Sequence, residues 1–277
     1  MHPLRFLHIP KTAGTTVTES LLAMNMRNYF WRNYFEFKGD LEADSRSYTN
    51  LPEAKRRSLI LATGHAPINT GIRSVDELPT FTFLRDPIAR TKSHCRHLLE
   101  GKSPEFWEEL GESDLDLDAL LERDVPQLTN LQTRYLLGSG NLHLPEKDAD
   151  ELVALALDSL ISKLTCFGIV EEFNRSMVVL THSLGWKTLP IYRVRNRSSE
   201  TRRVHFEDRH MEKLRSMNEL DIRLYGQAVP VFQERCRELG DALASDLARF
   251  EQQLGRRHLR FDLIDMGRSV KRVFQAP

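Results

Sequence analysis

The sequence predicts an α/β protein in which a central parallel sheet is flanked by helices. Short apolar runs at residues 4–9, 58–62, 80–84 and 165–170 alternate with helical patterns, as expected for parallel strands joined by crossover helices. The first run leads into a Gly-containing turn and then a helical pattern, which is typical of a buried parallel strand. No composition shift suggests a linker, so we expect one domain with helical insertions.

The expected elements follow the chain in order. Thr15 or Thr16 can cap a first helix that runs to about Met26, and Pro87 suits the first turn of another. Residues 28–56 lack clean periodicity and are expected to form loop and short helix. Further helices are expected at about 87–100, 104–111, 115–123, 129–137, 148–161, 171–184, 207–217, 219–239 and 240–254, with a short strand at 189–194. The single domain, 1–277, would then have a core at about 4–200 and a helical C-terminal region at about 207–277.

Composition excludes several classes of protein. Of the 277 residues, 40% are hydrophobic and 28% charged, which excludes a disordered or fibrous chain. Lys plus Arg and Asp plus Glu number 39 each, so no overall basic field favours nucleic acid or an acidic membrane, and any anion site must be local. Cys95, Cys166 and Cys236 lie too far apart for a zinc knuckle or a disulfide framework. With no apolar stretch near the ~20 residues of a membrane span, and no signal-like N-terminus, we expect a cytoplasmic protein.

The first chemical signal is the segment from His8 to Thr16, between the first expected strand and helix. Backbone N–H groups at a helix N-terminus carry partial positive charge and suit phosphate or sulfate oxygens. Gly14 would let the backbone approach an anion, while Lys11 adds a mobile positive charge and the threonines add hydroxyl donors. Because Lys11 precedes the glycine, the segment is not a Walker A loop and ATP or GTP hydrolysis is disfavoured. The plainer alternative is a strand–helix turn with an exposed lysine.

The second signal follows the strand expected at 80–84. Arg85 comes at the carboxyl end of that strand, where open α/β sheets place their ligands. Ser93 lies about two turns into the following helix. An Arg fork and a Ser hydroxyl in this arrangement can converge on one phosphate group.

Together, HIPKTAGTT and FLRDPIARTKSH resemble the sulfotransferases that use 3′-phosphoadenosine 5′-phosphosulfate (PAPS) and release PAP. The resemblance is greatest to the carbohydrate branch with heparan sulfate and uronyl 2-O-sulfotransferases and their bacterial relatives, and weaker similarity continues at 130–138 and 167–173. It implies a P-loop-like domain and a hydroxyl acceptor on a carbohydrate. It also implies that Arg85 and Ser93 bind the 3′-phosphate. The residues implied at the 5′-phosphosulfate are Lys11, Thr12, Ala13, Gly14, Thr15 and Thr16.

Sulfuryl transfer is an in-line displacement in which positioning and charge stabilisation matter most. Lys11 would stabilise charge on the leaving group, and a base must take the proton of the acceptor hydroxyl. His65 follows the second expected strand, and the resemblance also implies a histidine base in this stretch. His65 could instead be a loop residue that only bonds to backbone, and His94, beside Ser93, is a second candidate for the base.

Other features leave alternatives open. His94 and His97 lack a second ligand pair with zinc-like spacing, so no metal is expected. The basic run from Arg193 to Arg203 is either a solvated loop or a lid over donor or acceptor. The aromatic residues Tyr29, Trp31, Tyr34 and Phe35 could stack on a sugar or belong to a core or a homodimer patch. The rival functions are a non-catalytic PAP-binding protein and a nucleotide kinase with a variant phosphate loop.

Overall fold

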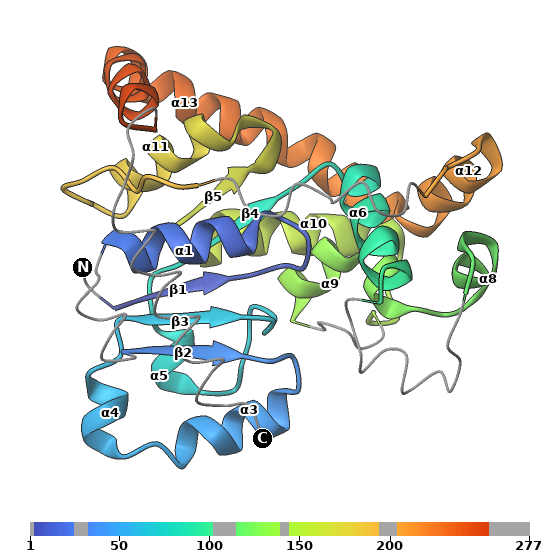
Figure 1. Ribbon diagram of the computed structural model, residues 1–277, viewed down its shortest axis with the longest axis horizontal. Helices are drawn as coiled ribbons and strands as arrows, with labels where there is room; N and C mark the ends of the chain where they lie inside the picture. Colours follow the sequence, from blue (N-terminus) through green and yellow to red (C-terminus); the bar gives the residue numbers. More distant parts are fainter. Residues whose placement is uncertain (1–2, 25–32, 102–114, 139–143, 194–203, 255–277) are drawn as a thin grey trace.

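The computed structural model describes residues 3–24, 33–101, 115–138, 144–193 and 204–254. At its centre is a five-stranded sheet in the order β2-β3-β1-β4-β5, whose neighbouring strands are all parallel, as the arrows in Figure 1 show. The strands are β1 (Leu4–Leu7), β2 (Tyr34–Phe37), β3 (Leu61–Gly64), β4 (Thr80–Leu84) and β5 (Cys166–Ile169). The predicted α/β class with a parallel sheet is therefore confirmed.

Helices surround this sheet (Figure 1). They are α1 (Gly14–Met24), α3 (Leu41–Thr49), α4 (Glu53–Arg57), α5 (Arg73–Asp76), α6 (Pro87–Leu99), α8 (Leu117–Glu122), α9 (Leu131–Leu137), α10 (Ala149–Asp158), α11 (Phe173–Ser183), α12 (Asp208–Met217) and α13 (Glu219–Leu254). Single turns of 3-10 or π geometry lie at Pro126–Leu128, Ser159–Lys163 and Val170–Glu172. No helix in these ranges combines the length and hydropathy needed to cross a membrane. The helix expected at 104–111 lies outside the described residues.

Three sequence-based expectations need correction. Residues 28–56 include an edge strand, β2, which the sequence pattern did not predict. Because β2 pairs only with β3 and is half-buried, it lacks the continuous apolar run of a central parallel strand. The strand expected at 58–62 begins three residues later, at Leu61. The strand expected at 189–194 does not form over its described part, 189–193.

The helical C-terminal region also follows the expected division. The range of α13 spans Glu219 to Leu254, but Gly240 has φ 49° and ψ −128° and breaks the helical geometry there. The sequence places the start of a new helix at this residue. In Figure 1, α13 extends along the β5 side of the sheet beside α11 and then turns. It packs against α9 and α10, and Asp221 near its start accepts hydrogen bonds from the backbone of Gln132 and Thr133 in α9.

The order of the strands brings particular loops together. The chain leaves β1 toward the β2 edge of the sheet, whereas it leaves β3 across β1 toward β4. The carboxyl ends of β1 and β3, which are neighbours, therefore form a topological switch point. Open α/β sheets bind ligands in the crevice at such a point. The loops that follow β1 and β3 carry Lys11 and His65.

Candidate functional site

The loop between β1 and α1 has an unusual backbone. Lys11 has φ 70° and Ala13 has φ 64°, both left-handed values that side-chain-bearing residues seldom adopt. Each such residue costs on the order of 1–2 kcal/mol, and such residues cluster at ligand sites. Left-handed residues alternating with ordinary ones turn backbone N–H groups into an anion-binding concavity. The loop geometry thus fits the anion site expected from the sequence.

Internal contacts fix this loop. Thr12 is fully buried, and its Oγ1 donates to the Ile9 carbonyl over 2.8 Å, so its side chain holds the turn from inside. The structure gives a steric reason for glycine at position 14. A Cβ on Gly14 would lie 1.7 Å from His8 Nε2, so only glycine admits the imidazole of His8 at this position.

Helix α1 begins at Gly14 and has no acidic residue in its first turn. Thr15 is exposed and Thr16 is half-buried. The positive end of the helix dipole is therefore not offset by a local carboxylate within the helix. These features suit binding of a phosphate or sulfate group.

A hydrogen bond from Arg85 connects the segment after β4 with the loop after β1. It follows β4 directly, and its Nη1 donates to the Lys11 carbonyl oxygen over 3.0 Å. Burial lowers the pKa of Arg85, and the carboxylates of Glu171 and Asp86 oppose that shift. Ser93 lies about two turns into α6 and is half-buried.

The backbone around Arg85 is held on two sides. Arg85 N donates to Gln132 Oε1, and Gln132 Nε2 donates to Arg85 O, both over 2.9 Å. Asp86 N donates to Glu171 Oε1 over 3.0 Å. Asp86 also caps α6 by accepting from Ala89 N over 2.7 Å. Sequence reasoning missed Gln132 and Glu171, although a Gln inside the otherwise helical, mostly apolar stretch at 131–137 was a signal.

His65 comes directly after β3 and lies against His8. The two rings are 4.5 Å apart at their centroids and tilted by 38°. His65 Nδ1 lies 3.2 Å from the His8 carbonyl oxygen, which can only accept, so this bond requires the proton on Nδ1. In neutral His65 the lone pair is then on Nε2, as a general base requires. Burial, as the largest cause, lowers the pKa of His65 and keeps the ring neutral near pH 7.

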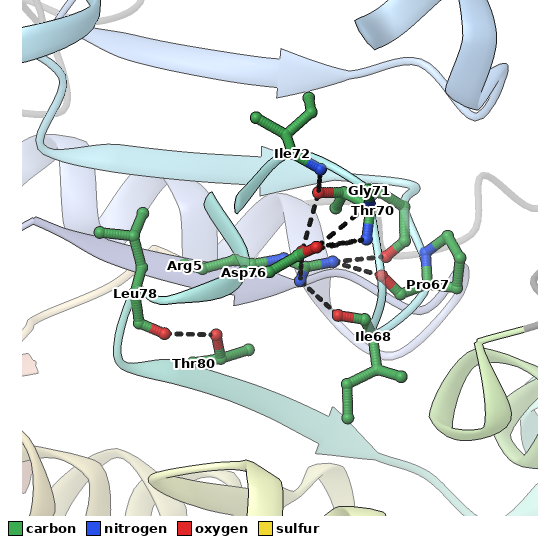
Figure 2. A network of polar contacts seen from close by, with 10 residues as sticks. Arg5, Pro67, Ile68, Thr70, Gly71, Ile72, Asp76, Leu78 and Thr80 are labelled. Carbon is green, nitrogen blue, oxygen red and sulfur yellow. Dashed lines mark hydrogen bonds and ion pairs between the residues drawn. The ribbon is translucent and has the colours of Figure 1, made fainter. Parts of the chain in front are cut away.

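A buried arginine, Arg5, holds the loop after His65 by hydrogen bonds to its backbone (Figure 2). Arg5 is only 2% exposed, yet its guanidinium donates to the carbonyls of Ala66, Pro67 and Ile68, the last over 2.6 Å. It also pairs with Asp76 over 3.2 Å, which in turn accepts from the backbone of Thr70 and Gly71. Burial lowers the pKa of Arg5 to about 10, which leaves it charged near neutral pH. The sequence signal was a charged residue in an apolar strand.

Several buried polar atoms near these loops lack a partner within the described residues. They are Thr63 Oγ1 in β3, and Arg90 Nε and Nη1 and His94 Nδ1 in α6. Buried polar atoms are normally satisfied by protein, water or a ligand. The pKa of His94 is well below its ordinary value, mainly through burial, and then through the positive charges of Arg90 and Lys11. His94 is thus electrostatically coupled to Lys11 in the loop after β1.

Two other expectations can be placed only in part. Phe35 packs edge-on against Phe37 and Tyr48, which favours the core interpretation for β2. Tyr29, Trp31 and residues 194–203 of the basic run lie outside the described residues. Within the described ranges, no three His, Cys, Asp or Glu side chains gather as metal ligands would.

Comparison with known proteins supports the resemblance seen in the motifs. The chain is similar to heparan-sulfate 6-O-sulfotransferases. It is 23% identical to heparan-sulfate 6-O-sulfotransferase 1 of Cricetulus griseus and of Mus musculus, over 83% of this chain and 67% and 65% of theirs. It is 24% identical to heparan-sulfate 6-O-sulfotransferase 1-B of Danio rerio over 65% of this chain and 49% of that protein. No family model matches the sequence.

These similarities bear on the fold and the activity at a coarse level. The parallel sheet with flanking helices is consistent with the P-loop-like sulfotransferase fold. The relatives are named as heparan-sulfate 6-O-sulfotransferases, so the narrower likeness to 2-O-sulfotransferases and bacterial relatives is not confirmed. The chain spans about two thirds of the length of the rodent relatives and about half that of the fish relative.

Proposed function

We propose that this protein transfers a sulfuryl group from PAPS to a carbohydrate hydroxyl and releases PAP. The observation that carries the proposal is the hydrogen bond from Arg85 Nη1 to the Lys11 carbonyl. This bond holds the two proposed anion-binding segments next to each other. A donor with phosphates at both the 5′ and the 3′ positions needs two such segments in one site. The similarity to enzymes named as heparan-sulfate 6-O-sulfotransferases supports the same chemistry.

The candidate residues contact different parts of the donor in this proposal. We assign the 5′-phosphosulfate to the loop and helix start at residues 11–16, and the 3′-phosphate to Arg85 and Ser93. PAPS supplies the activated sulfuryl group when it is bound. Lys11 stabilises the negative charge that grows on the leaving phosphate, a role whose loss costs ~3–4 kcal/mol in comparable sites.

His65 completes the mechanism as general base. Its Nε2 takes the proton of the acceptor hydroxyl as that oxygen bonds to sulfur. The bond from Nδ1 to the His8 carbonyl orients the ring and fixes the tautomer. His94 remains the alternative base, and exchange of each histidine separately distinguishes the two.

The test is sulfuryl transfer from labelled PAPS to a panel of glycans, including heparan-type chains and neutral oligosaccharides. We expect labelled glycan and PAP in equal amounts, without added metal and in the presence of EDTA. PAP binding without transfer to any acceptor would favour the non-catalytic alternative. Mg²⁺-dependent ATP turnover would favour the kinase.

A further inference from the structure

A side-chain amide takes the place of a neighbouring strand beyond the end of β4. The last registered pairs of β4 are Thr82 with Leu7 and Leu84 with Ile169, so Arg85 lies beyond the ladder on both sides. Gln132 bonds to both backbone groups of Arg85, each over 2.9 Å. The Gln132 amide thus pairs with the N–H and the carbonyl of Arg85 at the same time. The peptide units on both sides of the arginine are therefore fixed.

The position of Gln132 is itself fixed by a residue of α13, Asp221. Its side chain is 1% exposed, and its backbone N donates to Asp221 Oδ2 over 3.1 Å. The other oxygen of Asp221 accepts from Thr133 N over 2.8 Å and from Thr133 Oγ1 over 2.7 Å. Asn130, the residue before α9, makes no side-chain cap, so Asp221 caps this helix from another part of the chain. The buried carboxylate thereby determines where Gln132 lies.

A second connection from α13 reaches the next residue. Tyr225 Oη donates to Glu171 Oε2 over 2.8 Å, and Glu171 Oε1 accepts from Asp86 N over 3.0 Å. Asp221 and Tyr225 are one helical turn apart on α13. The start of α13 therefore supports residues 85 and 86 through two separate paths.

We propose that Gln132, held by Asp221, is a positioning residue for Arg85 and thereby for the 3′-phosphate of the donor. The proposal rests on the proposed function, in which Arg85 binds that phosphate. An arginine fork binds phosphate through two directed bonds, so its contribution depends on where its backbone is held. Gln132 touches neither donor nor acceptor in this assignment and acts through Arg85.

The test compares PAP with adenosine 5′-phosphate, which lacks the 3′-phosphate, by calorimetry. Gln132→Met keeps the length of the side chain and removes both hydrogen bonds. Gln132→Glu keeps the acceptor but places a carboxylate oxygen against the Arg85 carbonyl. We expect both variants to weaken PAP about three- to tenfold, the loss typical of one net hydrogen bond, and to leave adenosine 5′-phosphate binding unchanged. In an Arg85→Ala background Gln132→Met should have no further effect, because the two residues act as one unit.

Ser176 offers a matched control at the adjacent strand. Its Oγ accepts from Ile169 N over 2.8 Å and lies 2.9 Å from Ile169 O, so it brackets the end of β5 as Gln132 brackets Arg85. Ser176→Ala should lower the melting temperature and leave PAP affinity unchanged. If Ser176→Ala weakens PAP as much as Gln132→Met, or if Gln132→Met weakens both ligands equally, the inference fails while the proposed function stands. If Arg85→Ala does not weaken PAP, both fail.

Discussion

Arg85 Nη1 and the carbonyl oxygen of Lys11 lie 3.0 Å apart, which joins the ends of β4 and β1 across 74 residues of sequence. The bond satisfies a loop carbonyl while keeping a cationic fork beside the left-handed turn at Lys11 and Ala13. The two segments proposed to bind the donor's anionic groups thus share one edge of the sheet.

Arg85→Ala should weaken PAP binding by ~1.5–3 kcal/mol, roughly ten- to a hundredfold, because a charged donor to phosphate is lost. Isothermal calorimetry measures the change. Arg73→Ala is the control, since Arg73 is exposed and pairs with Glu77 just after α5. Wild-type affinity in Arg85→Ala would remove this arginine from the donor site.

Lys11→Ala should reduce turnover about 10²–10³-fold while changing PAP affinity much less, because the leaving-group charge develops only in the transition state. Steady-state rates with labelled PAPS, set beside PAP affinities, separate the two effects. Lys147→Ala serves as the comparison, since Lys147 is exposed and pairs with Glu151. An equal loss in rate and in PAP affinity would show that Lys11 contributes uniform binding only.

The pH dependence of the rate should reflect His65. Burial lowers the pKa of His65 below 6.5, so the neutral, active form prevails at pH 7 and is lost only as the pH falls through that lowered value. We expect an acid limb in kcat/KM with its midpoint below 6.5. His65→Asn retains a donor for the His8 carbonyl but no base, so it should fold normally and lose this limb together with most of the rate. Survival of the limb in His65→Asn, and its loss in His94→Asn, would identify His94 as the base.

Stability should also fall in acid. His94 is 7% exposed, and its pKa in the folded protein is well below 6.5, first because of burial and then because of Arg90 and Lys11. Below pH 6.5 the unfolded chain gains a proton that folded His94 does not bind. The free energy of unfolding is therefore greatest above pH 6.5 and decreases as the pH falls, by up to about 1.4 kcal/mol per pH unit for this group. Urea unfolding between pH 7.5 and 5 should show a shallower decrease in His94→Asn, and an unchanged slope would contradict the assignment.

Arg5→Met should cost about 3–5 kcal/mol of unfolding free energy, because it leaves Asp76 and three carbonyls without their buried donor. Urea titration gives the value. Arg57→Met is a suitable comparison, since Arg57 pairs with Glu53 on the surface of α4 and should cost little. Similar costs for the two variants would mean that the Arg5 network does not hold the loop after His65.

The local pattern of apolar and polar residues was sufficient to predict much of the fold. The strand predicted at 80–84 has those bounds in the structure, because this central parallel strand is buried throughout, is built of Thr, Phe and Leu, and is followed by the charged Arg85. The edge strand at Tyr34–Phe37 was missed because pairing on one side leaves a mixed pattern of apolar and polar residues. Gly14 was identified from the turn, but its steric need for glycine could not be read from the pattern, since the His8 ring that would meet a Cβ is placed by the fold.

The sequence by itself determined the α/β class and picked out the two segments proposed to bind the donor's anionic groups, because strand and helix periodicities and helix starts are local properties of the chain. Only the tertiary structure decided which groups hold those motifs in place. Gln132 lies 47 positions from Arg85, and Asp221 lies 89 positions from Gln132. Their roles depend on burial and on backbone groups left unpaired at a strand end and a helix start, and those conditions exist only after the chain has folded.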